Sequence, residues 1–172
     1  MRASLRKMID AAVFCAVIAA CAQILLPMPV GVPMTLQTLA VALCGYCLGW
    51  KYALAAVGTY LLLGGIGLPI FSGFGGGFGW LFGAGGGFLV GFLLIAVGCG
   101  LPMKNRIAKV LTGIAGLLVC HCCGVVWYAY VTHQSLWQAV LTGSLPYLWK
   151  DLLCVWLAEL IANKIGFFKK RY

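Results

Sequence analysis

The chain has 172 residues, of which 63% are hydrophobic and only 9% are charged. This composition excludes a soluble globular domain, whose surface would carry far more charge. The net charge of +9 would indicate a nucleic-acid partner in a soluble protein, but here most basic residues lie at the ends of long apolar runs. In that position they set membrane orientation and contact anionic headgroups, so we expect membrane lipid and no nucleic acid as a partner.

The apolar runs predict one all-α integral membrane domain, a compact bundle of six transmembrane helices. A hydrocarbon core of roughly 30 Å takes about 20 residues per helix, which leaves room for about six spans and no soluble domain. The basic N-terminus resembles a signal peptide, but the first apolar run is long and lacks a clear cleavage site, so we interpret it as a retained helix. The predicted helices cover residues of about 5–26, 34–50, 52–68, 85–103, 107–131 and 141–166.

The distribution of lysine and arginine predicts the topology of this bundle. Basic residues occur at the N-terminus, at Lys51, between Lys104 and Lys109 and from Lys164 onward, and the three connections that alternate with them carry no Lys or Arg. By the positive-inside rule, both termini and the basic turns are cytoplasmic, in a multi-pass protein of the cell inner (cytoplasmic) membrane.

The third connection, residues of about 69–84, is rich in glycine and in aromatic residues such as Phe71. Glycine permits backbone conformations closed to other residues and lets the backbone approach a ligand closely. A solvated linker would be polar, so we expect this outer loop to fold over the outer mouth of the bundle. The alternative is a re-entrant segment that only packs.

Lys150 and Asp151 are adjacent charged residues in the outer third of the last predicted helix. A charged side chain within a span costs roughly 2.5–3.5 kcal/mol at mid-membrane, so it normally pairs or faces a polar cavity. One interpretation is a donor and an acceptor for a small polar ligand. The other is an ion pair that only locks helices together.

Uncharged polar residues offer weaker candidates of the same kind. Thr35 and Gln37 lie at the outer end of the second predicted helix, and Tyr60 lies on the third. Each can hydrogen-bond either a ligand or a neighbouring helix.

The first helix carries a repeat of small residues, Ala12, Ala16 and Ala20. Residues four apart share a helix face, so this stripe allows another helix to approach closely. It predicts either packing within the bundle or a docking face for a membrane partner.

Several chemistries are not indicated. The glycines do not form the phosphate-binding loop of ATPases, so ATP would be bound only by partner subunits. The run from Cys120 to Cys123 includes His121, but consecutive residues on a helix point in different directions, so we expect no metal site and no cofactor. No nucleophile with a base is evident, and we predict that the chain is not an enzyme.

Four segments together resemble the BioY family, the six-helix biotin-binding S components of energy-coupling factor (ECF) transporters. They occur in the family's order and the resemblance covers nearly the whole chain. The segments are V-P-M-T-L-Q-T-L-A-V at 32–41, G-L-P-I-F-S-G at 67–73, G-A-G-G-G-F-L-V-G-F at 83–92 and L-P-Y-L-W-K-D-L-L at 145–153.

The resemblance implies a high-affinity biotin site on the outer side, beneath the loop between the third and fourth helices. Asp151 and Lys150 would then bind the ureido group or the carboxylate, and Phe71 would cover the ring. Thr35, Gln37 and Tyr60 would add hydrogen bonds, and glycine-loop N–H groups, including those of Gly86 and Gly87, would hold the carboxylate. The family also implies docking, through alanines that Ala12, Ala16 and Ala20 match, against a transmembrane coupling subunit that carries two ATPases.

The chain departs from the family pattern at three positions. Ala84 and Gly85 stand where the family usually has Pro and Thr, and Cys154 stands where it has a lysine three residues after the aspartate. Positions 150 and 154 are only about 40° apart around a helix and roughly 6 Å apart along it, so we predict that Lys150 takes over the missing lysine's role. Three alternatives stay open: an S component for another vitamin, a biotin carrier that acts without coupling subunits, and a structural membrane protein.

Overall fold

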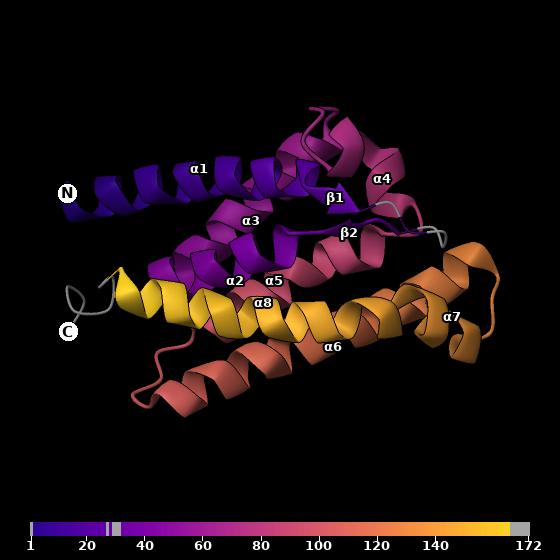
Figure 1. Cartoon of the computed structure of the whole chain (residues 1–172). Helices are drawn as coiled ribbons and strands as arrows, with labels where there is room; N and C mark the ends of the chain where they lie inside the picture. Colours follow the sequence, from indigo (N-terminus) through magenta and orange to yellow (C-terminus); the bar gives the residue numbers. More distant parts are fainter. Residues whose placement is uncertain (1, 27, 29–31, 166–172) are drawn as a thin grey trace.

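The computed structural model describes residues 2–26, 28 and 32–165, which fold into a bundle of long helices (Figure 1). Its α-helices are α1 (Arg2–Gln23), α2 (Gln37–Leu48), α3 (Trp50–Gly65), α4 (Phe78–Phe82), α5 (Gly86–Gly100), α6 (Arg106–Thr132), α7 (Leu136–Gly143) and α8 (Leu145–Lys164). A short 3₁₀ helix, η1 (Ser72–Phe74), precedes α4.

Helix α5 lies at the centre of the bundle, where it packs against α6, α2 and α3, while α8 packs against α2. Glycines make the α5–α6 approach close. A Cβ added at Gly98 would lie 2.5 Å from the Thr112 carbonyl oxygen, and one at Gly91 would lie 2.5 Å from Cys120 Sγ. Without a hydrophobic driving force between helices in lipid, such close packing is what holds membrane helices together.

Two predicted helices differ from the observed ones at their outer ends. The second begins at Gln37, because Met34–Thr35 (β2) pairs antiparallel with Leu25–Leu26 (β1) instead of continuing the helix. The last is divided into α7 and α8 at Ser144. Pro146 then lies in the first turn of α8, where a missing N–H is tolerated, whereas in the interior of one long helix it would remove a hydrogen bond.

The outer loop predicted at about 69–84 is structured. It contains η1 and α4, and it is tied to the end of α1 by Gln23, which donates to the Phe71 carbonyl oxygen at 3.0 Å and accepts from the Phe74 N–H at 2.9 Å. The loop therefore covers one end of the bundle and is not a free linker.

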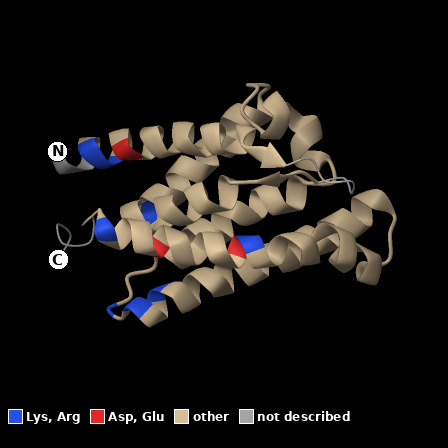
Figure 2. Ribbon diagram, in the orientation of Figure 1, with Lys and Arg blue, Asp and Glu red and all other residues tan. Residues whose placement is uncertain are grey.

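Figure 2 shows that the described Lys and Arg residues gather at the end of the bundle where the two termini lie, except for one beside an acidic residue in α8. That exception is the Lys150–Asp151 pair. Judged by length and composition alone, one of the described helices, the 27-residue α6, is long and apolar enough to cross a membrane. Helices α2 and α5 are shorter apolar helices.

Candidate ligand-binding site

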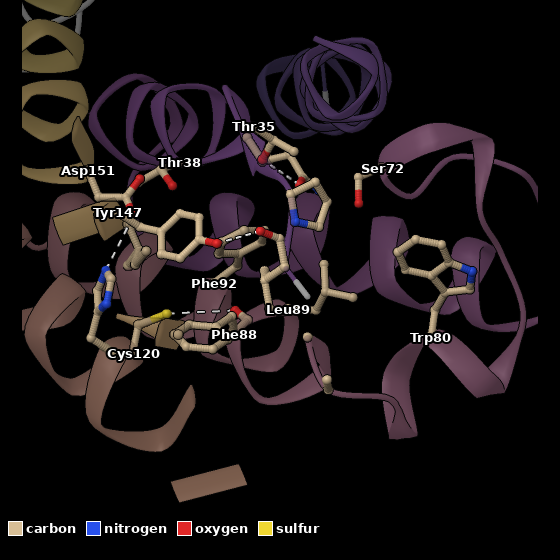
Figure 3. Close-up of a pocket in the computed structure, with 18 of the residues that line it drawn as sticks. Thr35, Thr38, Ser72, Trp80, Phe88, Leu89, Phe92, Cys120, Tyr147 and Asp151 are labelled. Carbon is tan, nitrogen blue, oxygen red and sulfur yellow. Dashed lines mark hydrogen bonds and ion pairs between the residues drawn. The ribbon is translucent and has the colours of Figure 1, made fainter. Parts of the chain in front are cut away.

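A cavity of about 440 Å³ lies at the end of the bundle opposite the termini, between α2, α5, α6 and α8 and beneath the outer loop (Figure 3). Its size is within the range of small-molecule sites, roughly 300–1,000 Å³. Such sites combine apolar walls with a few convergent polar groups. Both kinds of wall are present here, and they lie at different ends of the cavity.

The polar end is organised around Asp151, whose side chain is 9% exposed. Its Oδ1 lies 2.5 Å from Lys150 Nζ, and its Oδ2 lies 3.3 Å from His121 Nε2. The Thr38 side chain lies beside the same carboxylate (Figure 3). A buried carboxylate needs such partners, because an unpaired charge in a low-dielectric interior is very costly.

His121 links α6 to the break between α7 and α8. Its Nδ1 lies 2.8 Å from Ser144 Oγ, while its Nε2 faces Asp151. The two ring nitrogens thus bridge the carboxylate and the serine hydroxyl. The ring therefore fixes the orientation of Asp151 from the side opposite Lys150.

Ser144, His121 and Asp151 have the connectivity of a hydrolase triad, which the sequence did not indicate because the three residues lie far apart in it. The Ser144 hydroxyl is buried and Ser144 is not among the residues that line the cavity. A nucleophile must reach its substrate. The arrangement therefore holds the carboxylate and does not present a nucleophile to the cavity.

A second hydrogen-bonded chain extends from Lys150 to the outer loop. Lys150 Nζ donates to the Thr35 carbonyl oxygen at 2.7 Å, and the Thr35 hydroxyl donates to Gln37 Oε1 at 2.8 Å. Gln37 Nε2 then donates to the Tyr60 hydroxyl at 2.7 Å, which itself donates to the Ile70 carbonyl oxygen at 3.2 Å. The polar wall is thus connected by hydrogen bonds to the outer loop.

The other end of the cavity is mainly aromatic, although Ser72 also lies there (Figure 3). Trp80 of α4 lies at the opposite end from Asp151, and Phe88, Leu89 and Phe92 of α5 lie between them (Figure 3). Trp80 is 37% exposed, so it stands at the mouth of the cavity. The site therefore suits a compact ligand with a hydrogen-bonding group at one end and an apolar body.

The structure brings four of the predicted site residues to this cavity and leaves the other four outside its lining. Thr35, Gln37, Lys150 and Asp151 line it. Tyr60 and Phe71 lie behind the lining and are fully buried, with their ring centroids 5.4 Å apart. Tyr60 positions Gln37, and Phe71 supports Trp80 at a centroid distance of 6.5 Å.

Gly86 and Gly87 serve close packing where the structure places them. A Cβ at Gly86 would lie 1.7 Å from the Leu81 carbonyl oxygen, and one at Gly87 would lie 2.4 Å from the Trp127 Cβ. The glycine-loop residues that line the cavity are instead Gly79, Gly83 and Gly85.

Thr38, Trp80 and His121 are among the lining residues that were not predicted from the sequence. His121 could have been predicted, because an ionisable residue within an apolar run indicates a functional site for the same reason as Asp151 does. The neighbouring cysteines instead made His121 a candidate metal ligand. Thr38 and Trp80 had no signal that set them apart from other polar and aromatic residues nearby.

The family model for the BioY family matches residues 1–170 of the chain. The chain belongs to the BioY family. The resemblance seen in the sequence is therefore confirmed, and as a member of a transporter family the chain is a membrane protein. A transporter's substrate-binding component is not an enzyme class.

Relatives of this BioY chain carry matching names. It is 40% identical to the biotin transporter BioY of Thermotoga maritima, over 94% of this chain and 96% of the relative. It is 33% identical to the probable biotin transporter BioY of Pyrococcus horikoshii, over 78% of this chain and 80% of the relative.

The fold is that of a solved structure described as the S-component for biotin from an ECF-type ABC transporter. The TM-score is 0.87, with 95% of this chain and 92% of the solved chain covered and 22% identity. The all-α class predicted from the sequence is thereby confirmed.

The three positions at which the sequence analysis expected a departure from the family pattern all lie at or near the cavity. Ala84 and Gly85 are among its lining residues, which places no side-chain hydroxyl at either position. Cys154 is buried and outside the lining, whereas Lys150, one turn earlier, reaches into the cavity.

Proposed function

We propose that the chain binds biotin with high affinity and takes it up across the cell inner membrane as the substrate-binding subunit of an ECF-type transporter. The observation that carries this proposal is the cavity with Lys150 and Asp151 at its polar end. The relatives named as biotin transporters and the structural neighbour described as the S-component for biotin support biotin as the ligand.

Biotin has a ureido ring, a carboxylate and an apolar bicyclic body, and the cavity offers groups for each. Asp151 accepts from a ureido N–H, and Lys150 donates to the ureido oxygen or pairs with the carboxylate. Thr35 and Gln37 supply further hydrogen bonds. Trp80 and Phe88 cover the apolar body.

The membrane arrangement belongs to the same proposal. Six spans are formed by α1, α2, α3, α5, α6 and the α7–α8 pair, and both termini face the cytoplasm because the basic residues gather at that end (Figure 2). The cavity then opens toward the outside. No cofactor takes part in binding, and no covalent chemistry is needed.

The energy for transport comes from partner subunits in this proposal. Ala12, Ala16 and Ala20 are all exposed on α1, on a face that the rest of the described chain leaves uncovered. A transmembrane coupling subunit docks against this stripe of small residues and carries two ATPases.

The experiment that tests the proposal is calorimetric titration of the purified chain with biotin, riboflavin and thiamine in parallel. We expect heat from biotin alone, and a thermal shift equivalent to about 2.7 kcal/mol at 100 times its Kd. Asp151→Asn should abolish binding. Asp10→Asn is the matched control, since it removes a carboxylate outside the cavity. A response to riboflavin or thiamine instead would overturn biotin as the substrate.

A further inference from the structure

A second cavity, of about 220 Å³, lies at the end of the bundle where the termini are, far from the ligand-binding cavity. It is bounded by α1, the turn between α2 and α3, the end of α5 and the first turn of α6. Nothing in the proposed uptake of biotin uses it.

Three lysines from three different helices line this cavity: Lys7 of α1, Lys51 of α3 and Lys109 of α6. Among the described lining residues none is acidic. Glu159 attracts Lys109 from nearby but lies outside the lining, and its carboxylate is paired with Arg106 at 2.7 Å. The cavity is therefore a site of concentrated positive charge.

Aromatic rings hold two of the three ammonium groups. Lys7 Nζ lies 5.3 Å from the centroid of the Tyr52 ring, and Lys51 Nζ lies 5.3 Å from that of Trp50. A ring face attracts a cation without taking its N–H donors in the way a carboxylate does. The donors of these two lysines thus remain for an anion.

The remaining wall of the cavity is apolar, with Leu48, Leu101, Pro102 and Met103 in its lining. Trp50 is 40% exposed at its edge, as is usual for a tryptophan where a membrane meets water. An apolar wall does not stabilise a free inorganic anion. It can, however, contact the first acyl carbons of a lipid.

We propose that this lysine cavity binds the phosphate group of an anionic phospholipid, with the lysines on the phosphate and the apolar wall against the acyl chains. In the topology proposed above, the lipid belongs to the cytoplasmic leaflet, whose anionic lipids attract basic segments. It would join α1, which carries the alanine stripe, to α3 and α6.

The test is native mass spectrometry of the delipidated full chain in neutral detergent, titrated with phosphatidylglycerol or phosphatidylcholine. We expect one tightly bound phosphatidylglycerol and weaker phosphatidylcholine. The double variant Lys7→Gln/Lys51→Gln should bind phosphatidylglycerol at least about tenfold more weakly, since each basic residue near the headgroups adds to the attraction for an anionic lipid. The matched control is Lys104→Gln/Lys164→Gln, which removes the same charge at the same end but outside the cavity.

Three results would overturn the proposal: equal weakening in both double variants, equal affinity for the two lipids, or displacement of the lipid by millimolar inorganic phosphate. The first would indicate diffuse surface charge, and the last a site for free phosphate. Biotin titration of the same samples keeps the two proposals apart. We expect Lys7→Gln/Lys51→Gln to bind biotin as the unaltered chain does.

Discussion

Lys150 Nζ lies 2.5 Å from Oδ1 of Asp151, although neighbouring residues on a helix point about 100° apart. The contact forms because the long lysine side chain turns toward the cavity, where it also donates to the Thr35 carbonyl oxygen. The lysine side chain is 15% exposed and the aspartate 9%. The pair therefore ties α8 to the segment before α2 and holds the lysine ammonium at the wall of the cavity.

Lys150→Ala should weaken biotin binding by about 30-fold or more. Removing one member of a buried charge pair costs about 2–5 kcal/mol, much of it from the charge left unpaired. Calorimetric titration measures the change. Unaltered affinity would show that Lys150 is a packing residue and not a ligand donor.

Adding Cys154→Lys to Lys150→Ala should recover part of the lost affinity. Position 154 lies one turn further along α8 and near the same face, so a lysine there can reach the cavity. Cys154→Met in the same background is the control, because it adds length without charge. Equal affinities of the two double variants would contradict the exchange of roles between positions 150 and 154.

His121→Leu should lower both stability and biotin affinity. It removes the partner of Asp151 Oδ2 and leaves the buried Ser144 hydroxyl without its hydrogen-bond partner, at a cost of about 1–3 kcal/mol for each unsatisfied group. Thermal unfolding and calorimetry together measure the effect. The control is His133→Asn, because His133 is exposed and has a positive φ of 55° that Asn tolerates. His121→Leu with full biotin affinity would remove the histidine from the site.

Trp80→Ala should weaken biotin binding by roughly tenfold or more and speed dissociation, because a large aromatic side chain at the mouth of a site excludes water from the contacts behind it. Phe78→Ala is the matched control. Phe78 lies on the same short helix and is 62% exposed, but it does not line the cavity. Stopped-flow measurement of dissociation would contradict this role if both variants release biotin at the same rate.

The helical class could be predicted from the sequence because apolar runs of sufficient length have few structural alternatives in a membrane. The breaks at the outer ends could not. Pro146 is compatible with the start of a helix and with a kink inside one, and only the structure shows that the backbone of Ser144 leaves the helical region just before α8 begins. The pairing of Leu25 with Thr35 could not be predicted either, because strands of two residues are too short to give an alternating pattern in the sequence.

The polar end of the cavity could be predicted in part because a charged side chain inside a span is costly and therefore indicates a partner or a polar cavity. Lys150 and Asp151 gave that signal. The sequence does not distinguish the residues that line the cavity from those that lie behind its lining. Phe71 and Trp80 belong to one loop of similar composition, and only the structure shows that Trp80 faces the cavity while Phe71 supports it.

Ala16→Leu should prevent assembly with the coupling subunit while biotin affinity stays unchanged. Ala16 is exposed in the middle of the alanine stripe, so a larger side chain there holds a partner helix away without disturbing the core. Co-purification of the subunits measures assembly. Val17→Leu is the control, since Val17 is also exposed on α1 but lies beside the stripe. Normal assembly of the Ala16→Leu variant would move the docking face elsewhere.

Gly98→Ala should destabilise the fold by about 1–3 kcal/mol, the usual cost of overpacking a tight contact. The added Cβ would lie 2.5 Å from the Thr112 carbonyl oxygen and would push α5 away from α6. Gly58→Ala is the matched control within α3, because its Cβ would meet nothing within 4 Å. That substitution should instead stabilise the helix by about 0.5–1 kcal/mol. Thermal unfolding in detergent decides the matter: if the two variants melt together, the close α5–α6 contact does not hold the bundle.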